Sequence, residues 1–457
     1  MSAAEGMHWD PTALAIKRVL YPLWVLKNQS SRLRYLASLE ESQFWSRERL
    51  ADHQWSCFRQ IFTHAYETCP YYREKFRKAG VAPADLRSRA DIHRVPAISK
   101  EEIQDNRDQM NSSMYRKDDL IPDMTGGSTG SPMQFFYDKD RLDTREAATI
   151  RHDRWAGGDI GDRRALLWGA PQDTKLSQSP KDRLRDWIIA RRLILDASSL
   201  DEASMSTFAK KLLRYQPRII LAYANTLGLF AKFVRAQNIT GITAKAIITS
   251  AEVLTPENRQ LIEETFGCPV YNRYGSREFA VIASECSMHK GMHVNAENLL
   301  LEVVGESGPC IDQTGEILIT DLKNFAMPMI RYRIRDMGQL KAEPCECSRG
   351  LPLLELSGGR VTDFLTATDG RKVSGIVIAT YVITNIPGLA QIQFVQHERG
   401  SVTINLVKGR DWSVRTNDEL VRRTKKFLGA DMQTEIVLRE DIPLERSGKY
   451  RFAISTL

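Results

Sequence analysis

The segment from Thr125 to Pro132 has the composition of a loop that wraps a phosphate group. Glycines have no Cβ, so the backbone can turn its N–H groups toward an anion, and hydroxyl side chains add donors. The glycines are Gly126, Gly127 and Gly130, and the hydroxyl residues are Thr125, Ser128, Thr129 and Ser131. No Lys-Ser/Thr pair follows the last glycine, which excludes the loop of strand–loop–helix NTPases. Because Met133–Tyr137 is rich in β-formers, the loop is predicted to join two strands; an ordinary glycine turn is the alternative.

Three cysteines and a histidine form a second group, with the composition of a metal site. Cys286 precedes His289 and His293 in the segment ECSMHKGMH, and a Cys-Glu-Cys triplet follows at 345–347. Three thiolates and one imidazole are a common closed tetrahedral set for structural zinc. The predicted ligands are Cys286, His293, Cys345 and Cys347, with His289 as an alternative to His293. Scattered buried thiols beside an exposed histidine are the other interpretation.

Lys449 stands in the segment ERSGKYR near the carboxyl terminus. A glycine-supported loop can carry a lysine into a cleft between domains. Its ammonium group can then stabilise negative charge that develops at a phosphate, as a point charge rather than as a general base. The alternative interpretation is a solvated basic tail.

The apolar pattern predicts the elements that must position these groups. Strands alternate with helices between residues 164 and 274, which indicates parallel βαβ units. The expected strands are 164–169, 218–223, 246–250 and 270–274, and the expected helices are 141–155, 204–215, 225–236 and 256–266. Ligands of such sheets bind at the carboxyl ends of the strands, where Ser250–Glu252 and Tyr274–Glu278 fall.

The flanking segments complete an α/β fold. Residues 32–77 are predicted to be helical, with a break at Cys69-Pro70, and residues 100–110 to be a short helix. Alternating strands between residues 299 and 340 indicate a β-rich lobe. A small α+β unit follows, with helices at 376–384 and 417–428 and strands at 392–397, 401–407 and 434–439. The expected domains are 1–359, which includes a helical extension over about residues 1–80, and 360–457.

The composition is that of a soluble globular protein, with 42% hydrophobic and 26% charged residues over 457 positions. The net charge of +7 comes from 64 basic and 57 acidic residues spread along the chain, so nucleic acid is not an expected partner. Seven cysteines, an odd and sparse set, argue against a disulfide framework and for a reducing compartment. No signal-peptide pattern opens the chain, so a cytoplasmic location is expected.

The most apolar early segment is Ala13–Leu26, which contains Lys17, Arg18 and Pro22. It is too short and too interrupted to span a bilayer, so no transmembrane segment is expected. The prediction is a helix docked on the body of the protein, and a helix lying on a membrane surface is the alternative.

Five motifs, taken in order, resemble the adenylate-forming superfamily of acyl–coenzyme A synthetases, luciferases and peptide-synthetase adenylation domains. They are the glycine loop, YGSRE at 274–278, RYRIRD at 331–336, GRVTD at 359–363 and SGKYR at 447–451. Within it, the chain is similar to the phenylacetate–coenzyme A ligases, and AEVLT at 251–255 and DGRKVS at 369–374 most resemble their capsular-polysaccharide-biosynthesis branch. The resemblance covers residues 60 to 457, roughly.

The resemblance implies the superfamily's fold, with a large domain of βαβ subdomains and a β-rich lobe and a small mobile C-terminal domain. It also implies a site for ATP. The glycine loop would hold the β- and γ-phosphates, Ala251 and Tyr274 would enclose the adenine, and Asp336 would bind the ribose hydroxyls. Glu278 would bind Mg²⁺, with a solvated strand-end carboxylate as the alternative. The implied nucleotide site also includes Ser250, Glu252, Asn272, Arg273, Gly275 and Ser276.

The small domain is implied to carry Lys449 to the α-phosphate, and Arg360 at the hinge would contact the ribose or a phosphate. Asp363 fits the second acidic position of the hinge motif. The family commonly has Asp where Thr362 stands, but a rotating hinge needs only tolerant backbone angles. The family usually has Lys where Ser131 stands, so the phosphate charge must be met elsewhere or by Mg²⁺.

The RYRIRD motif also departs from the pattern, because Ile334-Arg335 stands where the family commonly has Thr-Gly. Arg335 would close on phosphate or face solvent. Arg331 and Arg333 alternate with Tyr332 on a strand, so both are predicted to point to one face. A charged outer face of the sheet is the expected place for one of the two.

The implied reaction has two steps, in which ATP and a small carboxylic acid give an acyl-adenylate and pyrophosphate, and an acceptor then displaces AMP. The acyl pocket is expected to be lined by Tyr223, Ala224, Asn225, Ser250, Asn272 and Arg273. Arg273 or Arg277 could recognise an acidic or polar acid. The acceptor is a thiol such as coenzyme A, or an amine; Thr366–Gly370 differs from the family segment that serves coenzyme A, which favours a non-thiol acceptor.

The implied ligands are therefore ATP, Mg²⁺ and a structural Zn²⁺ that pins the β-rich lobe without doing chemistry. The expected assembly is a monomer or a homodimer. The departures at Ser131, Thr362 and Arg335 support a second hypothesis, a non-catalytic nucleotide-binding, zinc-stabilised scaffold protein in a biosynthetic assembly.

Overall fold

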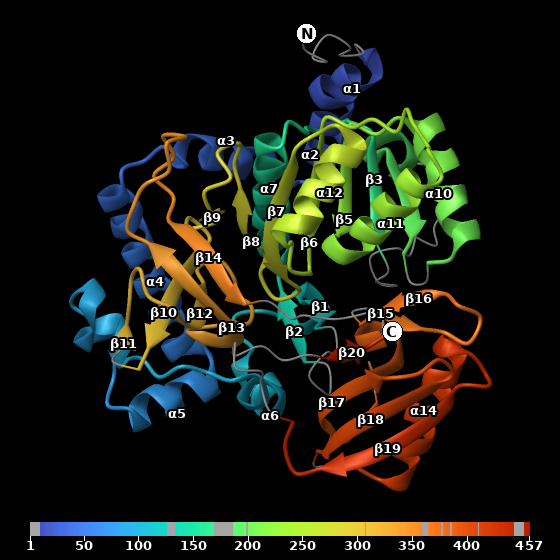
Figure 1. The fold of residues 1–457 in the computed structure, drawn as a ribbon. Helices are drawn as coiled ribbons and strands as arrows, with labels where there is room; N and C mark the ends of the chain where they lie inside the picture. Colours follow the sequence, from blue (N-terminus) through green and yellow to red (C-terminus); the bar gives the residue numbers. More distant parts are fainter. Residues whose placement is uncertain are drawn as a thin grey trace.

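The computed structural model describes residues 10–125, 133–168, 186–197, 200–306, 308–358, 364–375, 378–383, 386–409, 411–442 and 452–457. Figure 1 shows a large body formed by the N-terminal and central parts of the chain and a smaller C-terminal domain below it. Three predicted motifs lie outside the described residues: the glycine loop at 126–132, the hinge at 359–363 and the lysine loop at 443–451.

One half of a twelve-stranded sheet is parallel, as predicted. Its strand order is β4-β3-β5-β6-β7, and every neighbouring pair in that order is parallel. The strands are β3 (Arg164–Trp168), β4 (Arg192–Asp196), β5 (Ile219–Tyr223), β6 (Ala246–Ser250) and β7 (Val270–Ser276). The edge strand β4 was not predicted. The carboxyl ends of these parallel strands all lie at one edge of the sheet.

Helices cover both faces of the parallel strands, which explains their near-continuous apolar sequences. Ile220, Ala222 and Ile247 pack against α10 (Glu202–Tyr215), α11 (Ala224–Ala236) and α12 (Pro256–Phe266). Ile219 and Ile248 point the other way, into a cluster with Ala156 at the end of α7 (Lys139–Trp155). The predicted helices are thus confirmed: their last residues match, and their first residues differ by at most two positions.

The second half of the sheet is antiparallel and continues directly from β7, so the predicted β-rich lobe is not a separate layer. It consists of β8 (Ala280–Glu285), β9 (Met292–Val294), β10 (Leu299–Gly305), β11 (Gly308–Pro309), β12 (Gly315–Asp321), β13 (Tyr332–Lys341) and β14 (Leu353–Gly358). The helices α4 (Arg47–Thr68), α5 (Pro70–Lys78) and α6 (Lys100–Met110) share its core through Phe58, Phe76 and Ile103, respectively. The break at Cys69-Pro70 and the helix at 100–110 are confirmed.

The remaining helices of the body are short or lie at its surface. They are α1 (Pro11–Ala15), the π-helix η1 (Ile16–Leu20), α2 (Tyr21–Lys27), α3 (Arg32–Ser42), the 3₁₀ turns η2 (Pro83–Asp85), η3 (Arg89–Arg94) and η4 (Lys117–Asp119), and the π-turn η5 (Asp186–Ala190). In Figure 1 α1 projects at the top of the body, and the segment that follows docks on the body, because Ile16, Tyr21 and Val25 pack in one cluster with residues of α3 and α7.

A two-stranded hairpin flanks the glycine loop. β1 (Ile121–Met124) pairs antiparallel with β2 (Gln134–Tyr137), with Met124 opposite Gln134. The backbone N–H of Thr125 donates to the carbonyl oxygen of Met133 across 2.9 Å, which continues the ladder to the base of the loop. The prediction that the glycine loop joins two strands is confirmed.

The C-terminal domain has its own core, which includes Leu365, Phe394, Ile404 and Leu420. Its four-stranded sheet has the order β19-β18-β17-β20. The elements are β15 (Phe364–Thr366), β16 (Lys372–Ser374), the π-helix η6 (Ile378–Ile383), β17 (Leu389–Gln396), β18 (Ser401–Lys408), α14 (Val414–Leu428), β19 (Gln433–Arg439) and β20 (Ala453–Ser455). A β-bridge between Leu200 and Lys372 joins it to the body.

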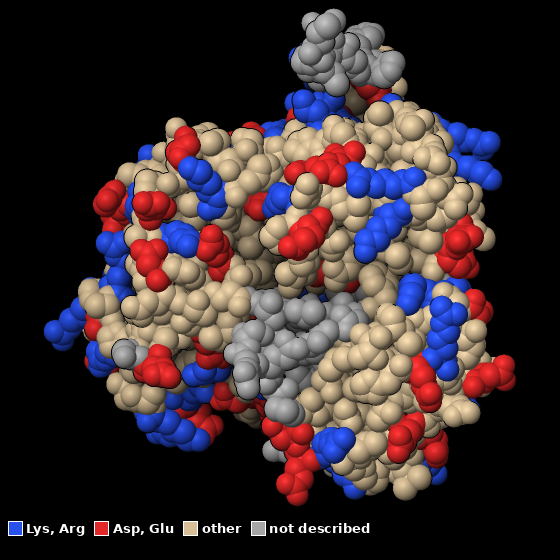
Figure 2. All heavy atoms as spheres, in the orientation of Figure 1, with Lys and Arg blue, Asp and Glu red and all other residues tan. Residues whose placement is uncertain are grey.

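The surface carries a mixed charge. In the view of Figure 2, the basic and acidic side chains of the described residues are interspersed rather than gathered by sign. Among the described helices, each is too short or too polar to cross a membrane.

Candidate functional site

Two residues that are distant in the sequence meet near the carboxyl end of β7. The hydroxyl of Tyr274 donates a hydrogen bond of 2.6 Å to Oδ2 of Asp336. Tyr274 belongs to β7 and Asp336 to β13, so the two halves of the sheet each supply one partner. The residues predicted to contact the adenine and the ribose are therefore neighbours, and the phenol and the carboxylate form a hydrogen bond with each other.

Glu278 lies in the turn between β7 and β8 and is half-buried. The hydroxyl of Tyr332 in β13 donates to its Oε1 across 3.4 Å. Gly275 allows the hairpin to close, because a Cβ there would lie 2.5 Å from the carbonyl oxygen of Ala280. The carboxylate predicted to bind Mg²⁺ thus lies at the same end of β7 as the Tyr274–Asp336 pair.

Arg145 of α7 connects this turn to the hairpin that flanks the glycine loop. Its Nη2 donates to the carbonyl oxygen of Arg277 across 2.7 Å and lies 3.8 Å from Oδ2 of Asp123 in β1. Its Cζ lies 4.5 Å from the centre of the Tyr137 ring in β2. No motif in the sequence pointed to Arg145. Its Nη1 is buried and has no hydrogen-bond partner among the described residues.

The end of β6 forms a third part of this edge. Ser250 Oγ donates to the carbonyl oxygen of Arg273 in β7 across 3.1 Å. Ala251 follows with a φ of 67°, a left-handed conformation that costs about 1–2 kcal/mol for a residue with a Cβ. The buried carboxylate of Glu252 accepts a 2.6 Å hydrogen bond from the backbone N–H of Asn225, in the first turn of α11. A carboxylate at that helix end is favourable.

The predicted acyl-pocket residues next to Asn225 also lie at this edge. The Tyr223 ring, at the end of β5, lies 4.2 Å from the ring of Trp168 at the end of β3. Ala224 is fully buried. Trp168 was not predicted to lie at the site, although its position near the end of an expected strand could have indicated it.

Arg273, which was predicted at the nucleotide site and in the acyl pocket, lies in a buried ion pair with α7. Its Nη2 lies 2.7 Å from Oδ1 of Asp153 in α7, and its Nε donates to Ser284 Oγ across 3.2 Å. Burial alone would raise the pKa of Asp153, but Arg164 and Arg273 hold that pKa below its usual value. The guanidinium therefore belongs to a buried ion pair on the α7 face, and this argues against its recognising an acid. The side chain of Asn272 takes the opposite face, by alternation along β7.

The prediction that Arg331 and Arg333 share a face is wrong. Arg331 has a φ of 50° just before β13 begins, so strand alternation does not extend to it. Its side chain is buried and pairs with Glu302, with Nε 2.9 Å from Oε2. Arg333 lies on the outer face and pairs with Glu316, as expected for one of the two.

Arg335 stands where a glycine is common in the family that the sequence resembles, and its backbone has a conformation that favours glycine. Its φ is 64°, in the left-handed region. Its side chain is half-exposed and lies 2.6 Å from Oε1 of Glu101, in the first turn of α6. Burial would raise the pKa of Glu101, but hydrogen bonds and Arg335 hold it below the usual value.

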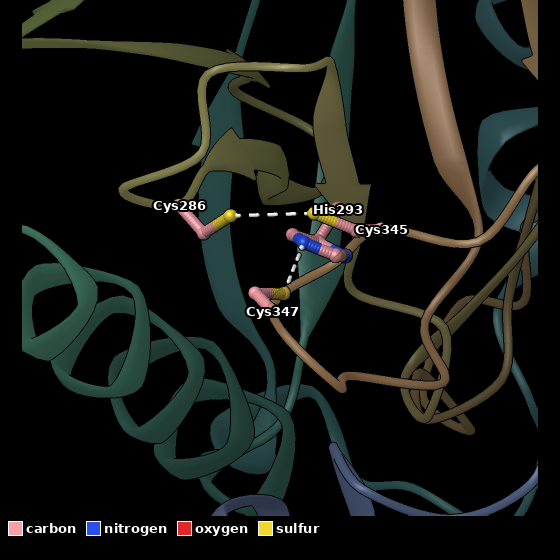
Figure 3. Close-up of side chains that lie close together, drawn as sticks. All are labelled: Cys286, His293, Cys345 and Cys347. Carbon is pink, nitrogen blue, oxygen red and sulfur yellow. Dashed lines mark hydrogen bonds between the residues drawn. The ribbon is translucent and has the colours of Figure 1, made fainter.

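The predicted zinc ligands converge on one point, as Figure 3 shows. One ligand atom from each of Cys286, His293, Cys345 and Cys347 lies within 4.8 Å of all the others. Cys286 Sγ is 3.7 Å from Cys345 Sγ, and Cys347 Sγ is 3.2 Å from His293 Nε2. These separations and this donor set suit a tetrahedral metal ion.

The surroundings of the cluster orient its ligands. His293 Nδ1 lies 3.4 Å from the carbonyl oxygen of Leu351, which leaves Nε2 free to face a metal. Burial lowers the pKa of His293 to about 4, so the imidazole is neutral, and burial raises the pKa of the Cys286 thiol to about 12. His289, the alternative ligand, instead lies 3.0 Å from Glu285 Oε2.

Several predicted site residues lie outside the described residues. They are Gly126, Gly127, Ser128, Thr129, Gly130, Ser131, Arg360, Thr362, Asp363 and Lys449. The strands β1 and β2 on either side of the glycine loop are described, and Arg145 contacts both of them.

Comparisons with known proteins agree with this architecture. The family described as "CapK C-terminal domain" matches residues 365–456. Protein CapK from Staphylococcus aureus is 25% identical over 403 residues, which is 88% of each chain. Phenylacetate–coenzyme A ligase from Pseudomonas putida is 27% identical over 313 residues, 66% of this chain and 70% of the relative. The Escherichia coli K12 enzyme of the same name is also 27% identical, with coverages of 66% and 68%.

Solved structures show the same fold. 2-Hydroxyisobutyryl–coenzyme A ligase in the thioesterification state, with an acyl-AMP and coenzyme A, has a TM-score of 0.62 at 18% identity, covering 89% of this chain and 90% of that one. The postadenylation state of that enzyme has a TM-score of 0.58 at 18% identity, with 88% of each chain covered. By sequence, this chain is a homologue of CapK and of the phenylacetate–coenzyme A ligases, and it shares the fold of 2-hydroxyisobutyryl–coenzyme A ligase.

Proposed function

We propose that this chain is an ATP-dependent carboxylate ligase that works through an acyl-adenylate. A carboxylate oxygen attacks the α-phosphorus of ATP and pyrophosphate leaves. The acceptor then attacks the acyl carbon, and AMP leaves with the former carboxylate oxygen. Holding both reactants at one sheet edge supplies much of the rate enhancement.

The observation that carries this proposal is the meeting of Tyr274, Asp336 and Glu278 at the end of β7. Asp336 offers a carboxylate for two ribose hydroxyls once the phenol of Tyr274 moves to the adenine. Glu278 offers a hard oxygen ligand for Mg²⁺ beside the phosphates. The contacts of Arg145 hold the hairpin of β1 and β2, which flanks the glycine loop, next to Glu278. One ATP molecule can therefore reach Tyr274, Asp336 and Glu278.

Arg145 supplies the positive charge that Ser131 does not. Its buried Nη1 lacks a partner among the described residues, so a phosphate oxygen would satisfy a donor that is now unsatisfied. Its hydrogen bond to the carbonyl oxygen of Arg277 and its position over Tyr137 fix the guanidinium. We expect Arg145→Met to raise the KM for ATP more than it lowers kcat.

Lys449 acts from residues 360–457, which turn as a unit about the hinge. The described contacts that this rotation must break include the bridge between Leu200 and Lys372, with two hydrogen bonds of 3.1 and 2.9 Å, and the packing of Phe364 against the core beside α10 and α11. Two hydrogen bonds are worth about 1–3 kcal/mol together, which a bound ligand can offset.

Coenzyme A is the acceptor we propose. The named ligase relatives in Pseudomonas putida and Escherichia coli are coenzyme A ligases, which outweighs the divergent Thr366–Gly370 segment. An amine acceptor stays the alternative because of that segment. Mass spectrometry of the product distinguishes a thioester from an amide.

The Cys/His cluster holds a structural Zn²⁺. Cys286 follows β8 directly, His293 belongs to β9, and Cys345 and Cys347 come from the loop that connects β13 to β14. A metal there would fix that loop against the sheet and would take no part in the reaction, because all four protein ligands close the coordination sphere.

Pyrophosphate exchange into ATP, with pools of carboxylic acids, tests the ligase proposal. We expect acid-dependent exchange that Lys449→Ala lowers by about 100-fold or more, whereas Lys426→Ala, at an exposed lysine of α14, leaves it unchanged. AMP binding without exchange in any pool would favour the scaffold hypothesis instead.

A further inference from the structure

The N-terminal helix has two apolar sides, and only one of them is buried. Ala13, Ile16, Tyr21 and Val25 are buried, and the last three pack against α3 and α7 in one cluster. On the other side, Leu14, Val19, Leu20, Leu23 and Leu26 are 38%, 51%, 40%, 58% and 75% exposed. Among the described residues, five of the thirteen exposed large hydrophobic side chains lie in this short segment.

A π-turn aligns both sides. The backbone N–H of Tyr21 donates to the carbonyl oxygen of Ile16, five residues earlier, so this turn holds one residue more than an α-turn. Pro22 gives the reason, because its ring cannot donate and would collide with the carbonyl of Arg18 in a regular helix. Across this turn the buried positions advance by five residues, from Ile16 to Tyr21, and the exposed positions do the same, from Leu14 to Val19. The exposed side therefore forms a continuous strip.

The strip lies within a basic segment. Asp10 is the one acidic residue between positions 10 and 34, and it pairs with Arg191. Arg18 and Lys27 are exposed and form no ion pair with any described residue. Their long stems can lie along the leucines while the charged ends reach outward, and Trp24 is half-buried at the margin of the strip.

We propose that this helix lies flat on an anionic lipid bilayer. Interfacial helices combine an exposed apolar strip with unpaired basic residues, and both features are present here. The helix is about 25 Å long and about 10 Å wide, so the strip covers on the order of 250 Å². That is well below the roughly 800 Å² per partner of a stable dimer, which favours a membrane over a second copy.

The position of the helix leaves the rest of the molecule free. In Figure 1 α1 projects at the end of the body opposite to the C-terminal domain, and α2 follows it at that same end. A bilayer in contact with this end of the body would therefore not touch that domain. The protein would bind reversibly, since a helix of this length buries its strip without spanning the bilayer.

Vesicle co-sedimentation of the full chain tests this inference. We expect binding to vesicles of phosphatidylcholine with phosphatidylglycerol, weaker binding to phosphatidylcholine alone, and a decline with salt. The double variant Leu23→Ser/Leu26→Ser should lower the partition coefficient by about tenfold or more. The matched control, Val414→Ser/Leu438→Ser, changes two exposed apolar residues of the C-terminal domain and should bind like the wild type.

A second variant separates charge from apolar area. Arg18→Glu/Lys27→Glu should remove the preference for anionic vesicles. All these positions are exposed, so circular dichroism should show the wild-type fold in each variant. Failure of the wild type to bind either vesicle would overturn the inference. A wild-type dimer in sedimentation velocity that Leu23→Ser/Leu26→Ser dissociates, without vesicle binding, would assign the strip to self-association.

Discussion

The Cys/His cluster and the strand-end site, which is formed by Tyr274, Asp336 and Glu278, differ in how completely the fold prepares them. In the cluster, four ligand atoms already lie within 4.8 Å of one another, and His293 is oriented by the carbonyl of Leu351. At the strand ends, Tyr274 bonds to Asp336 and Tyr332 to Glu278, so the polar groups are paired with each other. A closed structural site is complete once the chain folds, whereas a substrate site needs groups that exchange protein partners for a ligand.

This comparison predicts that damage to the cluster changes stability and damage to the strand-end site changes activity. Cys347→Ser should remove zinc and lower the free energy of unfolding by about 4 kcal/mol or more, a loss typical of a missing metal. Elemental analysis and urea unfolding measure the two effects. Cys310→Ser is the control, because its half-buried thiol lies outside the cluster and donates its hydrogen bonds to backbone oxygens. Wild-type protein that contains no zinc would contradict the prediction.

The second prediction concerns the ion pair beneath the strand ends. Asp153→Asn leaves Arg164 and Arg273 without their buried partner, so the free energy of unfolding should fall by about 3 kcal/mol at neutral pH. The pKa of Asp153 is lowered in the folded state, so its contribution is complete above the unfolded value of about 3.9 and is lost as the pH falls through the folded value.

Urea unfolding from pH 7 down to pH 3, roughly, would measure this dependence. The difference between wild type and Asp153→Asn should be largest at neutral pH and should narrow in acid. The exposed Asp418→Asn serves as the control. A difference that widened in acid would show that the pair does not stabilise the ionised carboxylate.

Glu278→Gln tests the other region. The amide keeps the shape and loses the charge, so pyrophosphate exchange should fall by about 100-fold, or about 2.7 kcal/mol, with an unchanged unfolding midpoint. Glu398→Gln, at an exposed glutamate, is the control for both measurements. Normal exchange in Glu278→Gln would remove this residue from the Mg²⁺ site.

The smallest effect is expected for Arg335→Gly. Glycine adopts the φ of 64° without strain, so the variant should be more stable by up to about 1 kcal/mol, less the small value of the Glu101 ion pair. Arg333→Gly, in the regular part of β13, should instead destabilise by about 0.5–1 kcal/mol. Equal effects of both substitutions in urea unfolding would mean that position 335 carries no backbone strain.

Much of the fold could be predicted because the parallel strands are buried on both faces and therefore appear as apolar runs between helices. The strand β20 was missed because three residues carry too little pattern, and its partner β17 is far away in the sequence. The cluster could be predicted because its ligand types are rare and chemically specific. The choice of His293 over His289 depended on the strand β9 and on Glu285, which holds His289.

The strand-end site could be predicted only in part, because motifs name residues but not their partners. Arg273 occurs in a motif-rich segment, yet strand alternation turns it to Asp153, whose position in α7 the sequence does not relate to it. Arg331 does not lie on the expected face because its φ is positive, and no pattern in the sequence indicates that angle. Arg145 lies in a helix without a motif, and only the folded chain brings it to the hairpin.

The most direct test of the central claim, that this chain activates a carboxylic acid as an acyl-adenylate, follows the oxygen atoms of the acid. An acid that supports exchange would be labelled with ¹⁸O in its carboxylate and turned over with ATP and coenzyme A, and the AMP would be analysed by mass spectrometry. The account predicts AMP that carries a single ¹⁸O atom. Unlabelled AMP, or ADP together with labelled inorganic phosphate, would contradict it.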